Sequence, residues 1–147
     1  MSVPEHPILI GCSGWSYPDW EGPFYPAGMA AGDYLEWYAD RFPIVEVDST
    51  FYRPPTPRMV RGWRDRTPDG FKFALKVPQV ITHQKQLRDC AEEVDGFVSS
   101  IEPLGSKLYC ALLQRVRSRL CHGLRGFSAL FLAGTSLSPH LERLPRL

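Results

Sequence analysis

Apolar and polar positions follow two different periods between residue 8 and Gln114. Short apolar runs, three to seven residues long, have the composition of buried strands, and they stand at 8–10, 44–47, 71–77 and 108–113. Three segments with apolar residues at helical spacing lie between these runs. The order predicts β-α-β-α-β-α-β, with parallel strands joined by right-handed crossovers.

Each predicted helix starts at a capping signal and has one apolar side. The signals are Asp33 with Glu36, Thr56 before Pro57, and Asp89 with Glu92. The apolar sides are formed by Tyr34, Leu35, Tyr38 and Phe42, by Met59, Val60 and Trp63, and by Val94, Phe97, Val98 and Ile101. Each face is wide enough to cover one side of a sheet.

An α/β fold of this kind is either an open doubly wound sheet or a (β/α)8 barrel. Glu46, Asp48 and Lys76 place charges on one face of their strands. A barrel tolerates inward polar residues near its carboxyl-end mouth, so these charges favour the barrel. The chain contains neither GxGxxG nor GxxxxGK[ST], which makes a nucleotide-binding doubly wound fold less expected.

Charge separates a tail from this pattern. Residues 1–114 carry 11 Lys and Arg against 15 Asp and Glu, whereas residues 115–147 carry six Arg and one acid, Glu142. The tail is rich in Leu and Ser, and its longest apolar run, FSALFLAG, is too short to cross a bilayer. No membrane association is therefore expected. Four cysteines without metal-ligand spacing, and a start without a signal peptide, predict free thiols in the cytoplasm.

Several motifs resemble one family, in the right order. The segments GCSGWSYPDWEGPFYP, YLEWYADRFPIVEVDSTFYRPPTP and GFKFALKVPQVITH, followed by PLGSKLYCALLQ, are similar to the domain of unknown function 72 family, the YecE-like proteins. The resemblance covers about residues 8–114 and implies a cytosolic, TIM-barrel-like protein whose activity is not established. It stops at Arg115, where the family has an aromatic residue and prolines.

The resemblance and the length together suggest a partial barrel. A (β/α)8 barrel needs about 250 residues, and this chain has 147. We expect residues 1–114 to form the N-terminal half, with four β/α units, and residues 115–147 to be a tail outside the family fold. A truncated or out-of-frame reading would explain such a tail, and a divergent natural C-terminus is the alternative.

Polar residues gather where the predicted strands end. The candidates for ligand binding are Ser13, Gly14, Trp15, Glu46, Ser49, Thr50, Tyr52 and Gln114, and those for catalysis are Asp48, Lys76 and His83. The carboxyl ends of barrel strands meet at one mouth, so these residues predict a site for a small polar or anionic ligand.

Two interpretations of the charged residues stay open. Glu46, Asp48 and Lys76 would either bind a ligand, with one carboxylate as general base, or form a buried ion pair that closes the barrel interior. His83 would be an acid/base group or an ordinary loop residue. No spacing requires a metal, so none is predicted, and the sequence indicates no cofactor.

The aromatic loop leaves a second function open. Trp15, Tyr17, Trp20, Phe24 and Tyr25 would offer stacking surfaces for nucleic acid if exposed, but such rings more often pack as a lid or local core. The acidic balance of residues 1–114 argues against nucleic acid. Whether the protein is an enzyme stays undecided, and a third alternative is a fragment with no function of its own.

Overall fold

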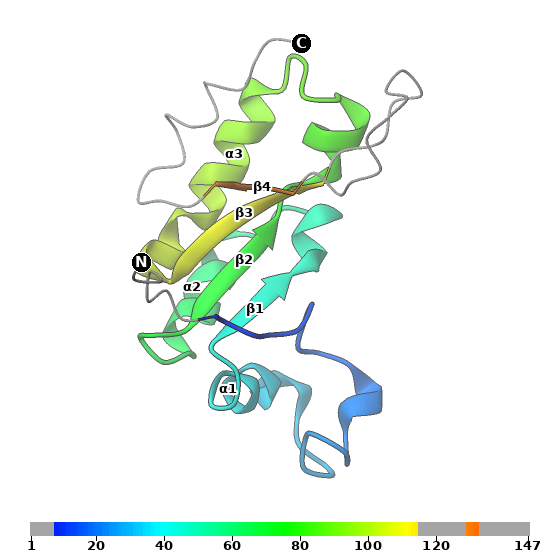
Figure 1. The fold of residues 1–147 in the computed structure, drawn as a ribbon, viewed down its shortest axis with the longest axis vertical. Coiled ribbons are helices and arrows are strands. Elements are labelled where there is room, and N and C mark those ends of the chain that lie inside the picture. The colour runs from blue at the N-terminus through cyan, green and yellow to red at the C-terminus, as the bar shows by residue number, and fades with distance from the viewer. Residues whose placement is uncertain (1–7, 115–128, 133–147) are drawn as a thin grey trace, which may run out of the picture.

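The computed structural model describes residues 8–114 and 129–132, and Figure 1 shows its fold. The strands are β1 (Ile44–Val47), β2 (Lys72–Lys76), β3 (Leu108–Gln114) and β4 (Ala129–Leu132). The helices are α1 (Tyr34–Ala39), α2 (Pro57–Asp65) and α3 (Ala91–Ile101). One sheet has the order β1-β2-β3-β4, with β1, β2 and β3 parallel and β4 antiparallel to β3. The α/β prediction is confirmed for the three parallel strands.

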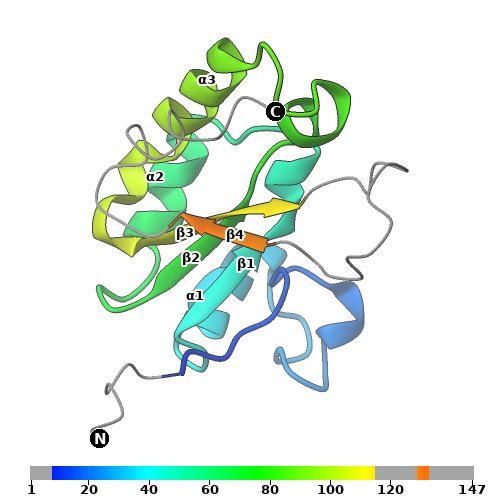
Figure 2. The same cartoon turned by 45° about the horizontal axis from the view of Figure 1, so that its top comes forward.

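Alternation along the strands divides the sheet into a core face and a polar face. In and around β2, Phe71, Phe73, Leu75 and Val77 are buried, while Lys72, Ala74 and Lys76 are half-buried. The first set packs in one core with the helices, which contribute Leu35, Tyr38, Val60, Phe97 and Ile101. Figure 2 shows α2 and α3 together on one side of the sheet. The described helices therefore leave the polar face without a helical cover.

One predicted helix cap is confirmed and two are wrong. Thr56 Oγ1 accepts the backbone N–H of Met59 at 3.3 Å, and Pro57 is the first residue of α2. Asp33 makes no side-chain cap, because it ends a 3-10 turn, Ala31–Asp33, that leads directly into α1. The prediction that Met59 is buried is also wrong, since it is 52% exposed.

The third helix begins one residue later than the capping pattern suggests. Cys90, not Asp89, holds the cap position of α3, and no side chain caps it. Asp89 has a φ of +46°, a left-handed conformation that is incompatible with an ordinary N-cap. The segment 78–87, which connects β2 to α3, contains a π-helical turn over Val80–Gln84.

The predicted strand at 8–10 is wrong, and a tyrosine explains why. Ile8 and Ile10 are 89% and 69% exposed, and the segment joins the sheet only through a parallel bridge between Ser13 and Glu46. The Tyr38 hydroxyl accepts the Cys12 N–H at 2.7 Å and donates to the Ile44 carbonyl at 3.0 Å. It stands where a direct ladder bond between Cys12 and Ile44 would continue the strand pairing.

β4 lies within the predicted tail. Its backbone pairs with β3 from Ala111↔Leu132 to Gln114↔Ala129. The rest of residues 115–147 lie outside the described residues, so the domain boundary at Gln114 stays a prediction.

Replacing Gly62 with alanine is expected to stabilise the protein. Gly62 lies inside α2, and a Cβ there would meet no atom within 4 Å. Alanine has a higher helix propensity, so the free energy of unfolding should rise by about 0.5–1 kcal/mol. Urea unfolding measures the change, and a decrease would show that the space beside α2 is occupied.

Candidate functional site

The carboxyl end of β1 leads directly into the candidate site. Asp48 begins a 3-10 turn, Asp48–Phe51, immediately after Val47. Within this turn Thr50 is 1% exposed, and its hydroxyl lies 2.8 Å from the Val47 carbonyl and 2.6 Å from the Lys76 carbonyl. Thr50 therefore holds the ends of β1 and β2 together, which is a structural position rather than a ligand contact.

Lys76, Phe51 and His83 lie together at the carboxyl end of β2. The Lys76 Nζ atom lies 5.3 Å from the centre of the Phe51 ring. The His83 ring meets the same ring at a centroid distance of 4.9 Å and an interplanar angle of 83°. The sequence named Lys76 and His83 but missed Phe51, although its place directly after DST at a strand end was a usable signal.

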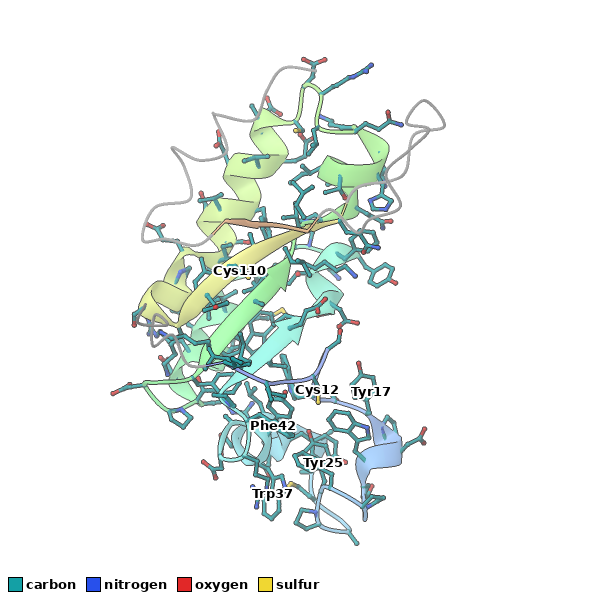
Figure 3. The ribbon with its side chains drawn as sticks, viewed as in Figure 1. Cys12, Tyr17, Tyr25, Trp37, Phe42 and Cys110 are labelled. Carbon is teal, nitrogen blue, oxygen red and sulfur yellow. The ribbon has the colours of Figure 1, made fainter. Side chains whose placement is uncertain are left out.

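Tyr17 lies near the carboxylates of Asp48 and Glu46 at this end of the sheet. Its hydroxyl donates to the Ser13 carbonyl, and Gly14 between them has a φ of +81°. Burial raises the pKa of Tyr17, and the nearby carboxylates of Asp48 and Glu46 raise it further. Figure 3 shows Tyr17 and Cys12 close together on the N-terminal segment, beside β1. Tyr17 was predicted only as part of the aromatic loop.

The predicted ion cluster of Glu46, Asp48 and Lys76 is not formed by direct contact. Within residues 8–114, the ion pairs are Arg64–Asp65, Arg66–Glu36 and Lys85–Glu93. The interpretation of the three charges as a closed ion pair therefore has no support in the described part of the chain. Lys76 is half-buried and faces an aromatic ring instead of a carboxylate.

The remaining predicted ligand residues are spread around this end. Ser49 and Tyr52 follow Asp48 and are exposed, Tyr52 at 72%. Gln114 ends β3 and is half-buried, with its backbone paired to Ala129. Ser13 is exposed beside Glu46.

The aromatic loop is packed, and Trp15 packs with it. The Trp15 ring meets Trp63 of α2 edge-on at 5.8 Å, on the core side of the sheet. Tyr25 is fully buried and stacks on Tyr34 at 3.9 Å, while Phe24 contacts Trp20, Tyr25, Tyr38 and Phe42. The structure thus assigns Trp15 to the core and not to the wall beside Asp48.

Cys110 lies on the polar face, in register with Ala74 and, through it, with Glu46. Its side chain is buried, and burial together with the Glu46 carboxylate raises the pKa of the thiol to about 11. A thiol with so high a pKa is protonated at neutral pH and is a poor nucleophile. Cys110 is therefore unsuited to catalysis at this site.

Cys110 should make stability fall at alkaline pH. Its pKa in the folded protein, about 11, is above the ordinary thiol value of 9.0, so the folded state retains a proton that the unfolded state releases. The contribution is complete below pH 9 and is lost as pH rises toward 11. Denaturant unfolding of the wild type and Cys110→Ala at several pH values measures it. Parallel pH curves for the two proteins would contradict the assignment.

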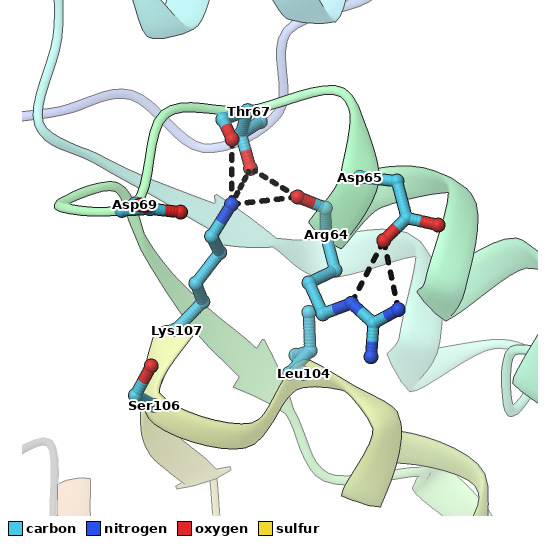
Figure 4. Close-up of a pocket in the computed structure, with 7 residues that line it drawn as sticks. All are labelled: Arg64, Asp65, Thr67, Asp69, Leu104, Ser106 and Lys107. Atoms are coloured by element: carbon cyan, nitrogen blue, oxygen red, sulfur yellow. Dashed lines mark hydrogen bonds and ion pairs between the residues drawn. The ribbon is translucent and has the colours of Figure 1, made fainter.

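An open depression of about 400 Å³ lies at the opposite, amino end of the strands. Figure 4 shows its lining, which includes Arg64, Thr67 and Lys107. Lys107 is 6% exposed and donates to the carbonyls of Arg64 at 2.6 Å and Thr67 at 2.5 Å, and to the Thr67 hydroxyl at 3.2 Å. All three N–H groups of its ammonium are thus used within the protein. The depression therefore marks a structural contact between the end of α2 and the residue before β3, rather than a ligand site.

The described residues contain neither a metal cluster nor a membrane-spanning helix. No group of three or more His, Cys, Asp or Glu side chains there is arranged to hold a metal ion. No helix in the same ranges has the length and the apolar character that a bilayer crossing requires.

Known proteins share both the sequence and the fold. YecE of Escherichia coli K12 is 38% identical over 101 residues, covering 69% of this chain and 35% of its own length. YunF of Bacillus subtilis 168 is 36% identical over 113 residues, covering 73% and 39%. A DUF72 family protein of Thermotoga maritima has a TM-score of 0.65 at 33% identity, over 78% of this chain and 48% of its own.

The chain thus spans between a third and two fifths of the length of these curated relatives. The family model described as "Protein of unknown function DUF72" matches residues 9–133, and the match continues past Gln114 through β4. This match covers most of the sequence and agrees with the resemblance found in the strand-end motifs. The chain belongs to the DUF72 family.

Proposed function

We propose that the carboxyl ends of β1, β2 and β3 bind a small anionic or polar ligand. The observation that carries the proposal is Lys76, a half-buried residue whose ammonium group faces the Phe51 ring and has no carboxylate within ion-pair distance among the described residues. Partly desolvated cations are normally paired, and an aromatic ring offers only partial compensation. An anionic ligand would supply the missing charge.

The carboxylates of Asp48 and Glu46 add negative charge and hydrogen-bond acceptors to the site. Asp48 and Glu46 both influence Tyr17, so both lie at this end of the sheet. Asp48 would accept a hydrogen bond from a hydroxyl or amino group of the ligand, or act as a general base. The identity of the ligand would decide whether the protein catalyses a reaction and which reaction it is. Whether the protein is an enzyme therefore stays undecided.

We further propose that this region is the beginning of a TIM-barrel-like (β/α)8 fold. Three parallel strands lie side by side in sequence order, the Ser13 bridge adds the preceding segment to β1, and the described helices pack in the core on one face. These features support a barrel, whose ligands bind at the carboxyl ends of the strands. The free thiols of Cys12, Cys90 and Cys110 support a cytoplasmic location.

The nucleic-acid alternative has no observation in its favour. The rings of Trp20, Phe24 and Tyr25 stack on one another, on Tyr34 or on Phe42, so they do not offer a row of stacking surfaces.

Two lysines on one strand provide a matched test. Lys76 and Lys72 lie on the same face of β2, at its carboxyl and amino ends, and Lys72 Nζ donates to the Ser106 carbonyl at 2.8 Å. Inorganic phosphate and acetate are titrated calorimetrically into wild type, Lys76→Met and Lys72→Met. Lys76→Met should weaken binding at least tenfold, about 1.4 kcal/mol, and Lys72→Met should bind like wild type.

Equal binding by the two variants would overturn the assignment of the site to this end of the sheet. A wild type that binds neither anion would favour the alternative that this chain has no function of its own.

A further inference from the structure

His83 is held in one orientation beside Lys76. It lies in the π-helical turn Val80–Gln84, and its ring stands edge-on to the Phe51 ring on which the Lys76 ammonium also lies. Its Nδ1 atom is 2.7 Å from the hydroxyl of Thr82, a side chain that is 3% exposed. A buried hydroxyl at this distance holds the orientation of the ring.

The competing acceptor of the Thr82 hydroxyl is already satisfied. The Pro78 carbonyl lies 3.3 Å from Thr82 Oγ1, and it accepts the backbone N–H groups of Ile81 at 3.1 Å and Thr82 at 3.3 Å. A carbonyl oxygen has two lone pairs, and both have donors here. This crowding at the Pro78 carbonyl favours the assignment of the hydroxyl proton to the shorter contact, His83 Nδ1.

This assignment determines the other ring nitrogen. Neutral imidazole carries one proton, so an Nδ1 atom that accepts leaves the proton on Nε2. Within residues 8–114 Nε2 has no hydrogen-bond partner, and the buried side-chain atom without a partner in that range is Glu93 Oε2. His83 is half-buried, and an N–H at Nε2 has no acceptor among residues 8–114.

We propose that neutral His83, through Nε2–H, and Lys76, through Nζ, form a two-point clamp for the oxygens of a carboxylate or phosphate group above the Phe51 ring. The inference rests on the proposed function and adds to it the ligand class, an oxyanion, and a role for His83 as hydrogen-bond donor. Thr82 is the positioning residue that keeps Nε2 protonated. Because the imidazole donates while neutral, binding does not need an imidazolium.

The tautomer is read directly from the full chain labelled with ¹⁵N-histidine. The spectrum is recorded at about pH 8, where free imidazole is neutral. The four histidines are separated by comparison with His83→Gln. A protonated Nε2 and an unprotonated Nδ1 are expected at His83, and inorganic phosphate should shift the Nε2–H signal. An unprotonated Nε2 would overturn the proposal without any variant.

Three variants then test the clamp against the site itself. Phosphate binding should weaken about tenfold in His83→Phe, which keeps the ring, and remain within about threefold in His83→Gln, which keeps a donor. Gln84→Leu, an exposed neighbour on the same turn, is the control and should bind like wild type. Melting curves confirm that each variant is folded.

The two failures are distinguishable. If His83→Phe binds phosphate like wild type while Lys76→Met does not, the clamp is wrong and the proposed site stands. If the wild type gives no saturable shift with phosphate, both are overturned.

Discussion

Replacing Lys107 with methionine is expected to destabilise the protein by about 3 kcal/mol. The ammonium group satisfies the carbonyls of Arg64 and Thr67, and it reaches the end of α2 from the 3-10 segment Glu102–Lys107, which leads into β3. Methionine fills a similar volume but leaves the Thr67 carbonyl without a donor in a largely buried position, and it leaves the Arg64 carbonyl only the weaker donors of Thr67. Urea unfolding of the full chain measures the loss.

Lys72→Met is the control for this change. It removes an ammonium with one carbonyl acceptor, at the surface, so we expect less than about 1 kcal/mol. Similar losses for the two lysines would show that the depression around Lys107 admits enough water to solvate the carbonyls. The contact also gives a physical reason for the lysine in the KLY segment that carries the family resemblance.

Replacing Gly11 with alanine is expected to cost about 3 kcal/mol and to loosen the N-terminal segment from the sheet. A Cβ at this position would lie 2.0 Å from the Ile44 carbonyl oxygen, which is backbone and cannot turn away. Gly70→Ala, where a Cβ meets nothing within 4 Å, is the matched control and should be nearly neutral. Denaturation gives the stability, and hydrogen exchange at the Glu46 amide reports the bridge.

An unchanged stability in Gly11→Ala would contradict the close approach of this segment to β1. Faster exchange at the Glu46 amide without a loss of stability would contradict the expected free-energy cost, but it would agree with a loosened contact between this segment and β1.

The sequence predicted the fold well where side-chain periodicity and burial agree. The apolar pattern correctly placed the strands β1, β2 and β3 and the buried sides of α2 and α3. The failures arise from tertiary contacts. Ile8 and Ile10 have the pattern of a strand, but the Tyr38 hydroxyl takes the backbone groups that pairing would need. Glu36, expected to support a cap, instead accepts a hydrogen bond from Arg66 at 2.8 Å.

The candidate site was predictable in location but not in composition. The rule that parallel strands carry their polar residues at the carboxyl ends pointed to Lys76 and His83, which both lie beside Phe51 in the turn that Asp48 begins, and their role in binding stays a prediction. It could not tell that Thr50 faces inward to join two strands, or that the Phe51 ring contacts both a cation and an imidazole. Such distinctions depend on the course of the turn after β1, which short-range periodicity does not specify.

The Tyr38 hydroxyl has a consequence for association between molecules. An open strand edge is a template onto which another chain can add a strand, the usual first step of aggregation. On the outer edge of β1, Glu46 is bonded to Cys12 and Gly14, and the Ile44 carbonyl is occupied by Tyr38. Both acceptor and donor groups along this short edge are thus engaged within the chain. The contact of Glu46 with Cys12 and Gly14 would by itself leave part of the β1 edge open. Tyr38, a side chain from α1, thereby protects this edge from pairing with other molecules.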